Sequence, residues 1–291
     1  LVLGVIGFYG GIPLQEIFFF VVAVAVSAIP EGLPIAMTVA LSIGASRMAK
    51  RNVIIRKLIA VEGLGSCTFI ATDKTGTLTV DQQTAKSLVL PGGEVYKVTG
   101  EGYNGEGAVL DSKMQECTLD SSPALRRMIQ AIVICNEGDL VKDESSWTYA
   151  GDPIDVALLG LSYKSKTSPE EISKGIDIIS ETPFESERRY AMVYFKEGGI
   201  LKVAVKGAIE KIREKIDQEK YAALLNEAVS YAEDGYRIIA VGGGFVEEVL
   251  PQGDLPKMEL LGVVALIDPL RPEARPAVKA CQRAGIQVAM I

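Results

Sequence analysis

The sequence predicts a multidomain α/β protein with transmembrane helices, and three observations predict it. Residues 1–46 carry only two charged side chains, Glu16 and Glu31, as a membrane segment would. A short apolar run of β-favouring residues then ends directly before Asp73 and is followed by small, turn-forming residues. Beyond residue 86, a long polar block mixes strand and helix patterns, which indicates a separate α+β domain.

The composition excludes several classes of function. The 291 residues contain 30 Lys and Arg against 37 Asp and Glu, and no basic stripe of the kind that a nucleic-acid-binding protein carries. The absence of histidine excludes Ser-His-Asp triads and most catalytic zinc sites. The four cysteines are too scattered for a disulfide framework or a zinc site, which fits a reducing compartment. Carboxylates, lysines and the backbone must therefore carry the chemistry.

The apolar first part of the chain predicts membrane helices over residues 1–60. Residues 1–9 would end one helix, and a turn would separate them from a second apolar stretch over 14–45. At about 1.5 Å per residue that stretch exceeds a hydrocarbon core of about 30 Å, so we expect the helix to continue as a stalk over 47–57. The basic residues of this stalk favour the cytoplasmic side, although an ordinary solvated charge run is the alternative.

The segment PEGLP interrupts the second apolar stretch. Pro30 has no N–H and clashes with the carbonyl four residues earlier, so the carbonyl of Val26 loses its helical partner. Free carbonyl groups at membrane depth are tolerated where they line a cavity, and beside the carboxylate of Glu31 they form a site for a hard cation. A kinked, buried helix with a surface glutamate is the alternative.

Asp73 is the candidate nucleophile. It lies at the carboxyl end of the predicted strand, where open α/β sheets bind their ligands, and the turn after it lets backbone amides approach a phosphate. A carboxylate at this place can attack a γ-phosphoryl group in line and form an aspartyl phosphate. A turn-capping aspartate is the alternative.

Further elements are predicted inside the polar block and after it. The strands AMVYFK and ILKVAVK would form a hairpin around residues 197–199, and a helix over 218–234 would stop at Gly235 before the strand RIIAVG. The segment 268–291 predicts a loop, a helix opened by prolines and a final strand after Gly285.

The motif DKTGTLT, residues 73–79, resembles the signature of the P-type ATPases. The resemblance implies an incomplete haloacid-dehalogenase-like, Rossmann-type phosphorylation domain with an inserted nucleotide-binding domain. It implies that Asp73 accepts the phosphoryl group, that Lys74 balances charge and that Thr77 supports the loop. It further implies that Mg²⁺ is bound by Asp73 and by the backbone oxygen of Thr75.

PEGLP is similar to the fourth transmembrane helix of the type II pumps, which move Ca²⁺, Na⁺/K⁺ or related ions. This resemblance assigns the transported cation to Glu31 and to backbone oxygens of Val26, Ser27 and Ile29. Ca²⁺ is the expected ion, and the sequence leaves Na⁺, K⁺ or another cation open.

Five further motifs resemble the ATP-binding parts of the same family. TPFESERR, KGAIE, GDPIDVALL and GYRIIAVG resemble motifs of its nucleotide-binding domain, and DPLRPE resembles the hinge at which the chain re-enters the phosphorylation domain. By resemblance, Phe184 stacks on adenine and Arg189 contacts phosphate or ribose. The remaining expected ATP-binding residues are Lys206, Gly207, Arg237, Asp152, Asp155, Asp268 and Arg271.

These observations predict ATP-driven cation transport by an integral, multi-pass membrane protein of the plasma or inner membrane, with ATP, a small cation and the lipid bilayer as partners. We assign 61–85 and 263–291 to the phosphorylation domain and 86–262 to the nucleotide-binding domain, all cytoplasmic. Because both ends of the sequence lie in apolar runs, we expect it to be an internal fragment that binds nucleotide without turnover.

Two other functions stay open at this point. A soluble haloacid-dehalogenase-like phosphatase would need no detergent and would carry an acidic residue in place of Thr75. A nucleotide-binding module without turnover is the second alternative.

Overall fold

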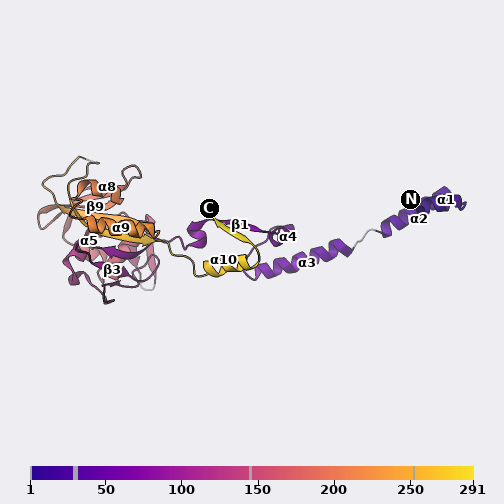
Figure 1. Cartoon of the computed structure of the whole chain (residues 1–291), viewed down its shortest axis with the longest axis horizontal. Coiled ribbons are helices and arrows are strands. Elements are labelled where there is room, and N and C mark those ends of the chain that lie inside the picture. The colour runs from indigo at the N-terminus through magenta and orange to yellow at the C-terminus, as the bar shows by residue number, and fades with distance from the viewer. Residues whose placement is uncertain (1, 29–31, 144–145, 252) are drawn as a thin grey trace. The chain divides into compact units, whose positions relative to one another are not determined.

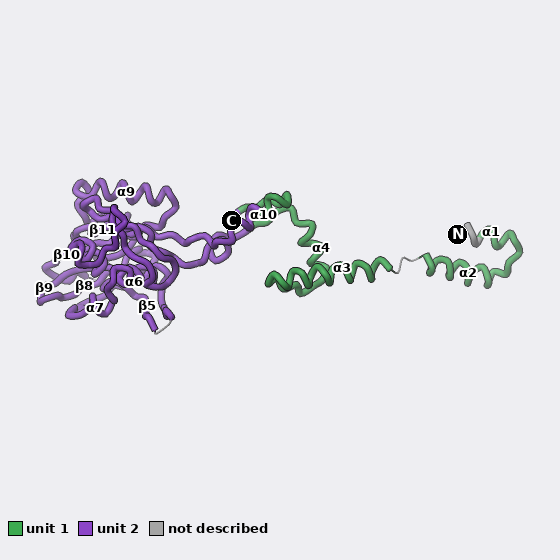
Figure 2. The backbone as a smooth tube through the Cα atoms, turned by 90° about the horizontal axis from the view of Figure 1, so that it is seen from below, with its two compact units in different colours: residues 1–71, 280–289 green, residues 72–279, 290–291 purple. Residues whose placement is uncertain are grey.

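The computed structural model describes residues 2–28, 32–143, 146–251 and 253–291. The chain divides into two compact units (Figure 2). The first unit contains residues 1–71 and 280–289, and the second contains residues 72–279 and 290–291.

The first unit begins with three helices, α1 (Val2–Tyr9), α2 (Leu14–Ser27) and α3 (Gly32–Ala49) (Figure 1). By length and composition, the stretch Leu14–Ala49 could cross a membrane, although it runs through residues that lie outside the described ones. The large apolar side chains of α2 and α3 are exposed, which suits a lipid-facing surface. α2 ends at Ser27 and α3 begins at Gly32. The predicted break at Pro30 lies outside the described residues.

The helix does not continue as the stalk that the sequence predicts over 47–57. It ends at Ala49, because Asn52 takes a left-handed conformation with φ 64°. The N–H of Val53 donates to the carbonyl of Met48 at 3.1 Å and that of Asn52 to Ala49 at 3.0 Å, which is a Schellman cap. The chain then runs without helix to α4 (Ile59–Gly65), so the prediction of a continuous stalk is wrong.

Two strands that are far apart in the sequence complete this part of the chain. β1 (Phe69–Thr72) pairs with β12 (Gln287–Met290), which follows α10 (Ala274–Arg283). Gly285, with φ 77°, separates the helix from the strand. The predicted strand before Asp73 is confirmed, and so are the helix, the glycine stop and the strand at the end of the sequence.

The second unit is built on an eight-stranded antiparallel sheet with the order β4-β3-β2-β11-β10-β9-β8-β7. Its strands are β2 (Thr84–Val89), β3 (Val95–Val98), β4 (Val109–Leu110), β7 (Ile176–Thr182), β8 (Tyr190–Glu197), β9 (Ile200–Gly207), β10 (Arg237–Phe245) and β11 (Glu259–Ile267). The predicted hairpin is the pair β8–β9, in which Glu197 pairs with Ile200. Gly198 and Gly199, with φ 58° and 79°, form its two-residue turn, as a hairpin with this short loop favours.

Both faces of this sheet are buried. Along β8, Ala191, Val193 and Phe195 belong to one hydrophobic cluster, and the alternate residues Tyr190, Met192 and Tyr194 belong to the other. This period of two is expected of a strand that is covered on both sides.

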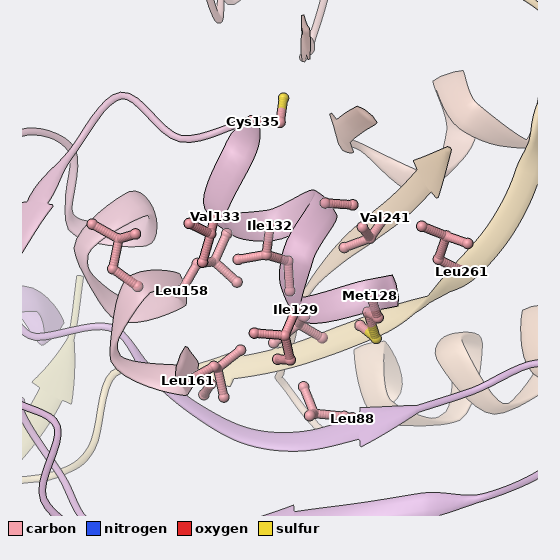
Figure 3. Packing of buried hydrophobic residues seen from close by; sticks show 14 of the residues in the cluster. Leu88, Met128, Ile129, Ile132, Val133, Cys135, Leu158, Leu161, Val241 and Leu261 are labelled. Atoms are coloured by element: carbon pink, nitrogen blue, oxygen red, sulfur yellow. The ribbon is translucent and has the colours of Figure 1, made fainter. Parts of the chain in front are cut away.

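Helices cover the two faces. On one face lie α5 (Pro123–Ile134) and α6 (Pro153–Lys164), and Figure 3 shows Met128, Ile129 and Ile132 of α5 close to Leu88, Val241 and Leu261 of the sheet. On the other face lie α8 (Ile209–Ile212) and α9 (Ala222–Glu233). The predicted helix over 218–234 is therefore confirmed as α9, with a later start. The other short elements are η1 (Lys74–Leu78), η2 (Leu119–Ser121), β5 (Asp139–Lys142), β6 (Trp147–Ala150), α7 (Pro169–Ser173) and η3 (Arg213–Lys215).

Candidate functional site

Two adjoining pockets, with volumes of about 690 and 470 Å³, lie in the second unit, where β8 and β10 begin and β9 ends. They share Ile154, Phe184, Gly207, Arg237 and Ile239. The larger pocket, which we call the outer pocket, also contains Arg189, Glu210 and residues of α9. The smaller, inner pocket also contains Glu137, Asp152, Asp155 and Lys206. The seven residues that the four short motifs single out between 152 and 237 thus all line one pocket or both.

A buried ion pair lies at the wall of the inner pocket. Lys206 of β9 and Asp155 of α6 are 4% and 7% exposed, and the Lys206 ammonium donates to Oδ1 of Asp155. The backbone N–H of Glu137 donates to Oδ2 at 3.0 Å, so both carboxylate oxygens are engaged. Asp155 lies in the first turn of α6, where the helix dipole favours a negative charge. Nearby, burial raises the pKa of the Cys135 thiol to about 12, against the opposing effect of Lys206, so this thiol is neutral.

Phe184 stands in the turn between β7 and β8 and belongs to both pockets. It is 53% exposed, so its ring offers a face on which a planar ligand can stack. Its backbone N–H donates to Oε1 of Glu137 at 2.7 Å, which fixes the main chain beneath the ring.

The same turn ends at Arg189, which has φ 63° and donates its N–H to the carbonyl of Glu185 at 2.7 Å. Its guanidinium pairs with Glu210 at 3.3 Å in an exposed contact, which stabilises the fold little. The guanidinium is therefore free to exchange Glu210 for an anionic ligand at small cost.

Gly207 is required by packing. A Cβ at this position would lie 2.5 Å from the carbonyl oxygen of Arg189 and 2.7 Å from Cα of Tyr190. The absence of a side chain thus lets the end of β9 lie against the start of β8. Gly207 also lines both pockets, so the absence of a side chain leaves room for a ligand there as well.

Asp152 and Arg237 complete the predicted set. Asp152 caps α6, because its Oδ1 accepts the N–H of Ile154 at 2.8 Å. Arg237 begins β10 and is exposed. Sequence reasoning missed four residues of the inner pocket. Gly151, Ile154 and Ile239 are members of motifs that were recognised, whereas Glu137 follows α5 and carries no local signal.

The DKTGTLT loop follows β1 and is a separate feature of the second unit. Asp73 is exposed and extended, with φ −71° and ψ 153°, and it directly precedes the irregular helical turn η1. Lys74, Thr75 and Thr77 lie in that turn and are exposed, and Gly76 takes φ 71°. The structure therefore presents the predicted nucleophile and its three neighbours to solvent in one loop.

Asp268 and Arg271 lie beside this loop, and neither lines the two pockets. The carboxylate of Asp268 accepts the hydroxyl of Thr79 at 2.5 Å and the N–H of Gln82 at 3.1 Å. The guanidinium of Arg271 donates to the carbonyl of Gly76 at 3.1 Å. Thr79 is 3% exposed, and sequence reasoning missed it as a site residue although it is the last letter of the motif.

The residues expected to bind metal ions fit Mg²⁺ by their chemistry. Asp73 and Thr75 would offer a carboxylate and a carbonyl oxygen, and Mg²⁺ usually takes one or two carboxylates together with waters and phosphates. Among the described residues, no group of three or more His, Cys, Asp or Glu side chains could hold a metal ion. For the transported cation, Val26 and Ser27 lie in the last turn of α2, whereas Ile29 and Glu31 are outside the described residues.

Comparison with known proteins gives a consistent result. The family model for the P-type ATPase, cytoplasmic domain N, matches residues 124–273. A cation-transporting ATPase (pma1) of Synechocystis sp. is 39% identical over 97% of this chain and 33% of its own length. The calcium-transporting ATPase of Bacillus subtilis is 35% identical over 98% of the chain and 34% of its length. The human calcium-transporting ATPase type 2C member 2 is 31% identical over 98% of the chain and 30% of its length.

The chain thus spans about a third of the length of the curated relatives that it matches. The family model runs from α5 to the segment beyond β11, so it includes strands β7 to β11 of the large sheet and all the residues that line the two pockets. The chain therefore belongs to the P-type ATPase family.

Proposed function

We propose that this protein takes part in ATP-driven transport of a cation across a membrane and that Asp73 accepts the γ-phosphoryl group of ATP. The single observation that carries the proposal is the convergence of seven motif residues on two adjoining pockets. Phe184 offers an exposed aromatic face for the base. Arg189 and Arg237 offer guanidinium groups suited to phosphate. The names of the relatives support the transport of a cation, and the calcium pumps among them favour Ca²⁺.

In the proposed chemical step, the carboxylate of Asp73 is the nucleophile. One of its oxygens attacks the γ-phosphorus, a new O–P bond forms, and the bond to the oxygen bridging the β- and γ-phosphorus breaks, so that ADP leaves. Lys74 balances the charge of the reacting groups, and the backbone of the loop approaches the phosphate. Mg²⁺, held by Asp73 and Thr75, would neutralise charge on the phosphates when bound.

The proposed architecture extends beyond the fold described above. Residues 61–85 and 263–291 would form the haloacid-dehalogenase-like phosphorylation domain, and residues 86–262 the nucleotide-binding domain inserted into it. The pairing of β1 with β12 supports this division, because one of these strands precedes residues 86–262 and the other follows them. Residues 1–60 would lie in the membrane, with Glu31, Val26, Ser27 and Ile29 at the cation site. The other domains would face the cytoplasm.

Phosphorylation from radiolabelled ATP tests the proposed acceptor. Membranes that contain the full gene product should form an acid-stable, hydroxylamine-labile phosphoenzyme, and Asp73→Asn should abolish it. Asp81→Asn is the matched control, since Asp81 follows the same loop but lies outside the motif. Labelling that survives in Asp73→Asn would show that another residue is the acceptor.

The cation is tested in the same assay. Ca²⁺, Na⁺ and K⁺ are added one at a time, and the proposed pump should label faster with its transported ion. A soluble phosphatase would label at a rate that does not depend on any of these ions. Cation-independent labelling would therefore reject transport while leaving Asp73 as the acceptor.

A further inference from the structure

Glu137 occupies a fixed place at the inner pocket, directly after α5. The side chain of Asn136 closes the turn before it, since Oδ1 accepts the N–H of Gly138 at 2.9 Å and Nδ2 donates to the carbonyl of Asp155 at 3.1 Å. These two hydrogen bonds tie the end of α5 to the first turn of α6. They hold the main chain of Glu137 against the buried ion pair.

Glu137 connects this ion pair with the aromatic residue of the pocket. Its backbone N–H donates to Oδ2 of Asp155 at 3.0 Å, and its Oε1 accepts the backbone N–H of Phe184 at 2.7 Å. The carboxylate of Glu137 therefore lies next to the main chain of Phe184. Because Glu137 and Phe184 both line the inner pocket, a flat ring that stacks on Phe184 inside this pocket would lie near the carboxylate.

The inner pocket contains two other acids, Asp155 and Asp152, whose carboxylates make hydrogen bonds to other parts of the protein. Both oxygens of Asp155 are engaged, one by the ammonium of Lys206 and one by the N–H of Glu137. Oδ1 of Asp152 caps the start of α6 by accepting the N–H of Ile154. Glu137 is exposed, and among the described residues its Oε1 accepts from Phe184 whereas its Oε2 accepts no hydrogen bond from the protein. This oxygen is the acceptor that adjoins Phe184.

We infer that Glu137 determines the base specificity of the pocket, an inference that rests on the proposed binding of ATP at this site. Oε1 holds the main chain of Phe184, and Oε2 accepts a hydrogen bond from the exocyclic 6-amino group of adenine. An ionised carboxylate accepts hydrogen bonds and donates none. It therefore favours a 6-amino purine and repels the oxygen of a 6-oxo purine, a repulsive element of the kind that specificity often needs.

Binding of ATP and of ITP, which carries an oxygen in place of the 6-amino group, tests this role. The full chain in detergent is titrated with each nucleotide, and the ratio of the two dissociation constants is measured. We expect the wild-type protein to bind ATP about tenfold more tightly than ITP, the factor that corresponds to about 1.4 kcal/mol. Glu137→Gln should bring the ratio close to one. Its amide still accepts from Phe184 and can donate to the 6-oxygen.

Two further variants separate specificity from support of the fold. Glu137→Ala removes both functions of the carboxylate, so it should weaken the binding of both nucleotides and also abolish the preference for ATP. Asp139→Asn removes the same charge from the neighbouring strand β5 and lines neither pocket, so it should keep the tenfold preference. Thermal unfolding followed by the fluorescence of Trp147 verifies that each variant is folded.

An unchanged preference for ATP in Glu137→Gln would overturn the inference. The same holds if this variant binds both nucleotides equally more weakly, so that the ratio of the two dissociation constants stays the same. A preference that disappears in Asp152→Asn but persists in Glu137→Gln would assign the role to Asp152 instead. Failure of the underlying proposal looks different: the wild-type protein would bind neither nucleotide, or Phe184→Ala would leave ATP binding unaffected. Either result would reject the proposal that ATP binds in these pockets.

Discussion

The hydroxyl of Thr79 donates a hydrogen bond of 2.5 Å to the carboxylate of Asp268, although 189 residues separate the two. Asp268 also accepts the backbone N–H of Gln82 at 3.1 Å, and Leu270 pairs with Thr79 in an isolated bridge. The segment after β11 therefore lies against the end of the DKTGTLT loop. The loop that carries Asp73 is held in place by a carboxylate from the far end of the sequence.

Thr79→Val should loosen this loop. The substitution keeps the shape of the side chain but leaves Asp268 with only the N–H of Gln82. Because hydrogen bonds to charged groups contribute about 1.5–3 kcal/mol, we expect a loss of stability of about this size and slower phosphorylation of Asp73. Thermal unfolding and the rate of phosphoenzyme formation measure the two effects. Thr79→Ser retains the hydroxyl and should behave like the wild type; equal behaviour of the valine and serine variants would contradict the prediction.

Breaking the buried pair of Lys206 and Asp155 should destabilise the second unit strongly. Lys206→Met leaves the buried carboxylate of Asp155 without its ammonium partner, which typically costs about 3–5 kcal/mol. Denaturant unfolding followed by the fluorescence of Trp147 measures the change. The double variant Lys206→Met, Asp155→Asn should lose less unfolding free energy than the two single variants lose together, because it has no unpaired buried charge. Strict additivity would show that the pair contributes no coupling.

The predictions that succeeded rest on local signals. The strand before Asp73, the β8–β9 hairpin and α10 are specified by short runs of residues and by glycines at 198, 199 and 285 that take positive φ. The order of the eight strands carries no such signal, because β2 pairs with β11 from the other end of the block. The predicted stalk failed at a single residue, Asn52, whose left-handed conformation ends α3.

The residues of the candidate site also fall into those that a local motif identifies and those whose position depends on distant contacts. The seven residues that four of the motifs single out line the two pockets, because they lie at the start of α6, in the β7–β8 turn, at the end of β9 and at the start of β10. The predicted residues of DPLRPE, Asp268 and Arg271, lie beside the DKTGTLT loop instead. Glu137 was missed because its place depends on hydrogen bonds to Asp155 and Phe184, which come from two other elements. Thr79 was missed because its partner, Asp268, lies 189 residues away.

Gly207→Ala should destabilise the protein and disturb both pockets. The added Cβ would lie 2.5 Å from the carbonyl oxygen of Arg189, a backbone atom that cannot move without shifting β8. Overpacking of this kind typically costs about 1–3 kcal/mol. Gly63→Ala is the matched control, because a Cβ in that helix meets no atom within 4 Å and alanine favours the helix. The midpoints of thermal unfolding compare the two, and an equal effect of both substitutions would contradict the packing argument.

Lys164 should make the stability of the protein depend on pH. It is the last residue of α6 and is 3% exposed. Burial, and to a lesser extent the charge of Lys86, lowers its pKa from 10.5 to about 8, against the opposing effect of Glu101. Below pH 8 the ammonium is charged in both the folded and the unfolded state, and its burial costs free energy. Between pH 8 and 10.5 the unfolded chain holds the proton more tightly, so the contribution of Lys164 to stability rises with pH.

Lys164→Met removes this dependence and should raise the free energy of unfolding at pH 7. A shift from 10.5 to about 8 corresponds to about 3 kcal/mol, so the advantage of the methionine variant over the wild type should shrink by about that amount as the pH rises to 10.5. Denaturant unfolding at pH 7 and near pH 10, followed by Trp147 fluorescence, measures the difference. The control is Lys166→Met, whose side chain is 51% exposed and should give the same difference from wild type at both pH values. Tyrosines also ionise near pH 10 in the unfolded chain, and burial raises the pKa of Tyr103, Tyr163, Tyr190 and Tyr194 in the folded protein, so only the difference between variant and wild type isolates the lysine. A difference for Lys164→Met that stays constant with pH would show that this ammonium is solvated in the folded protein.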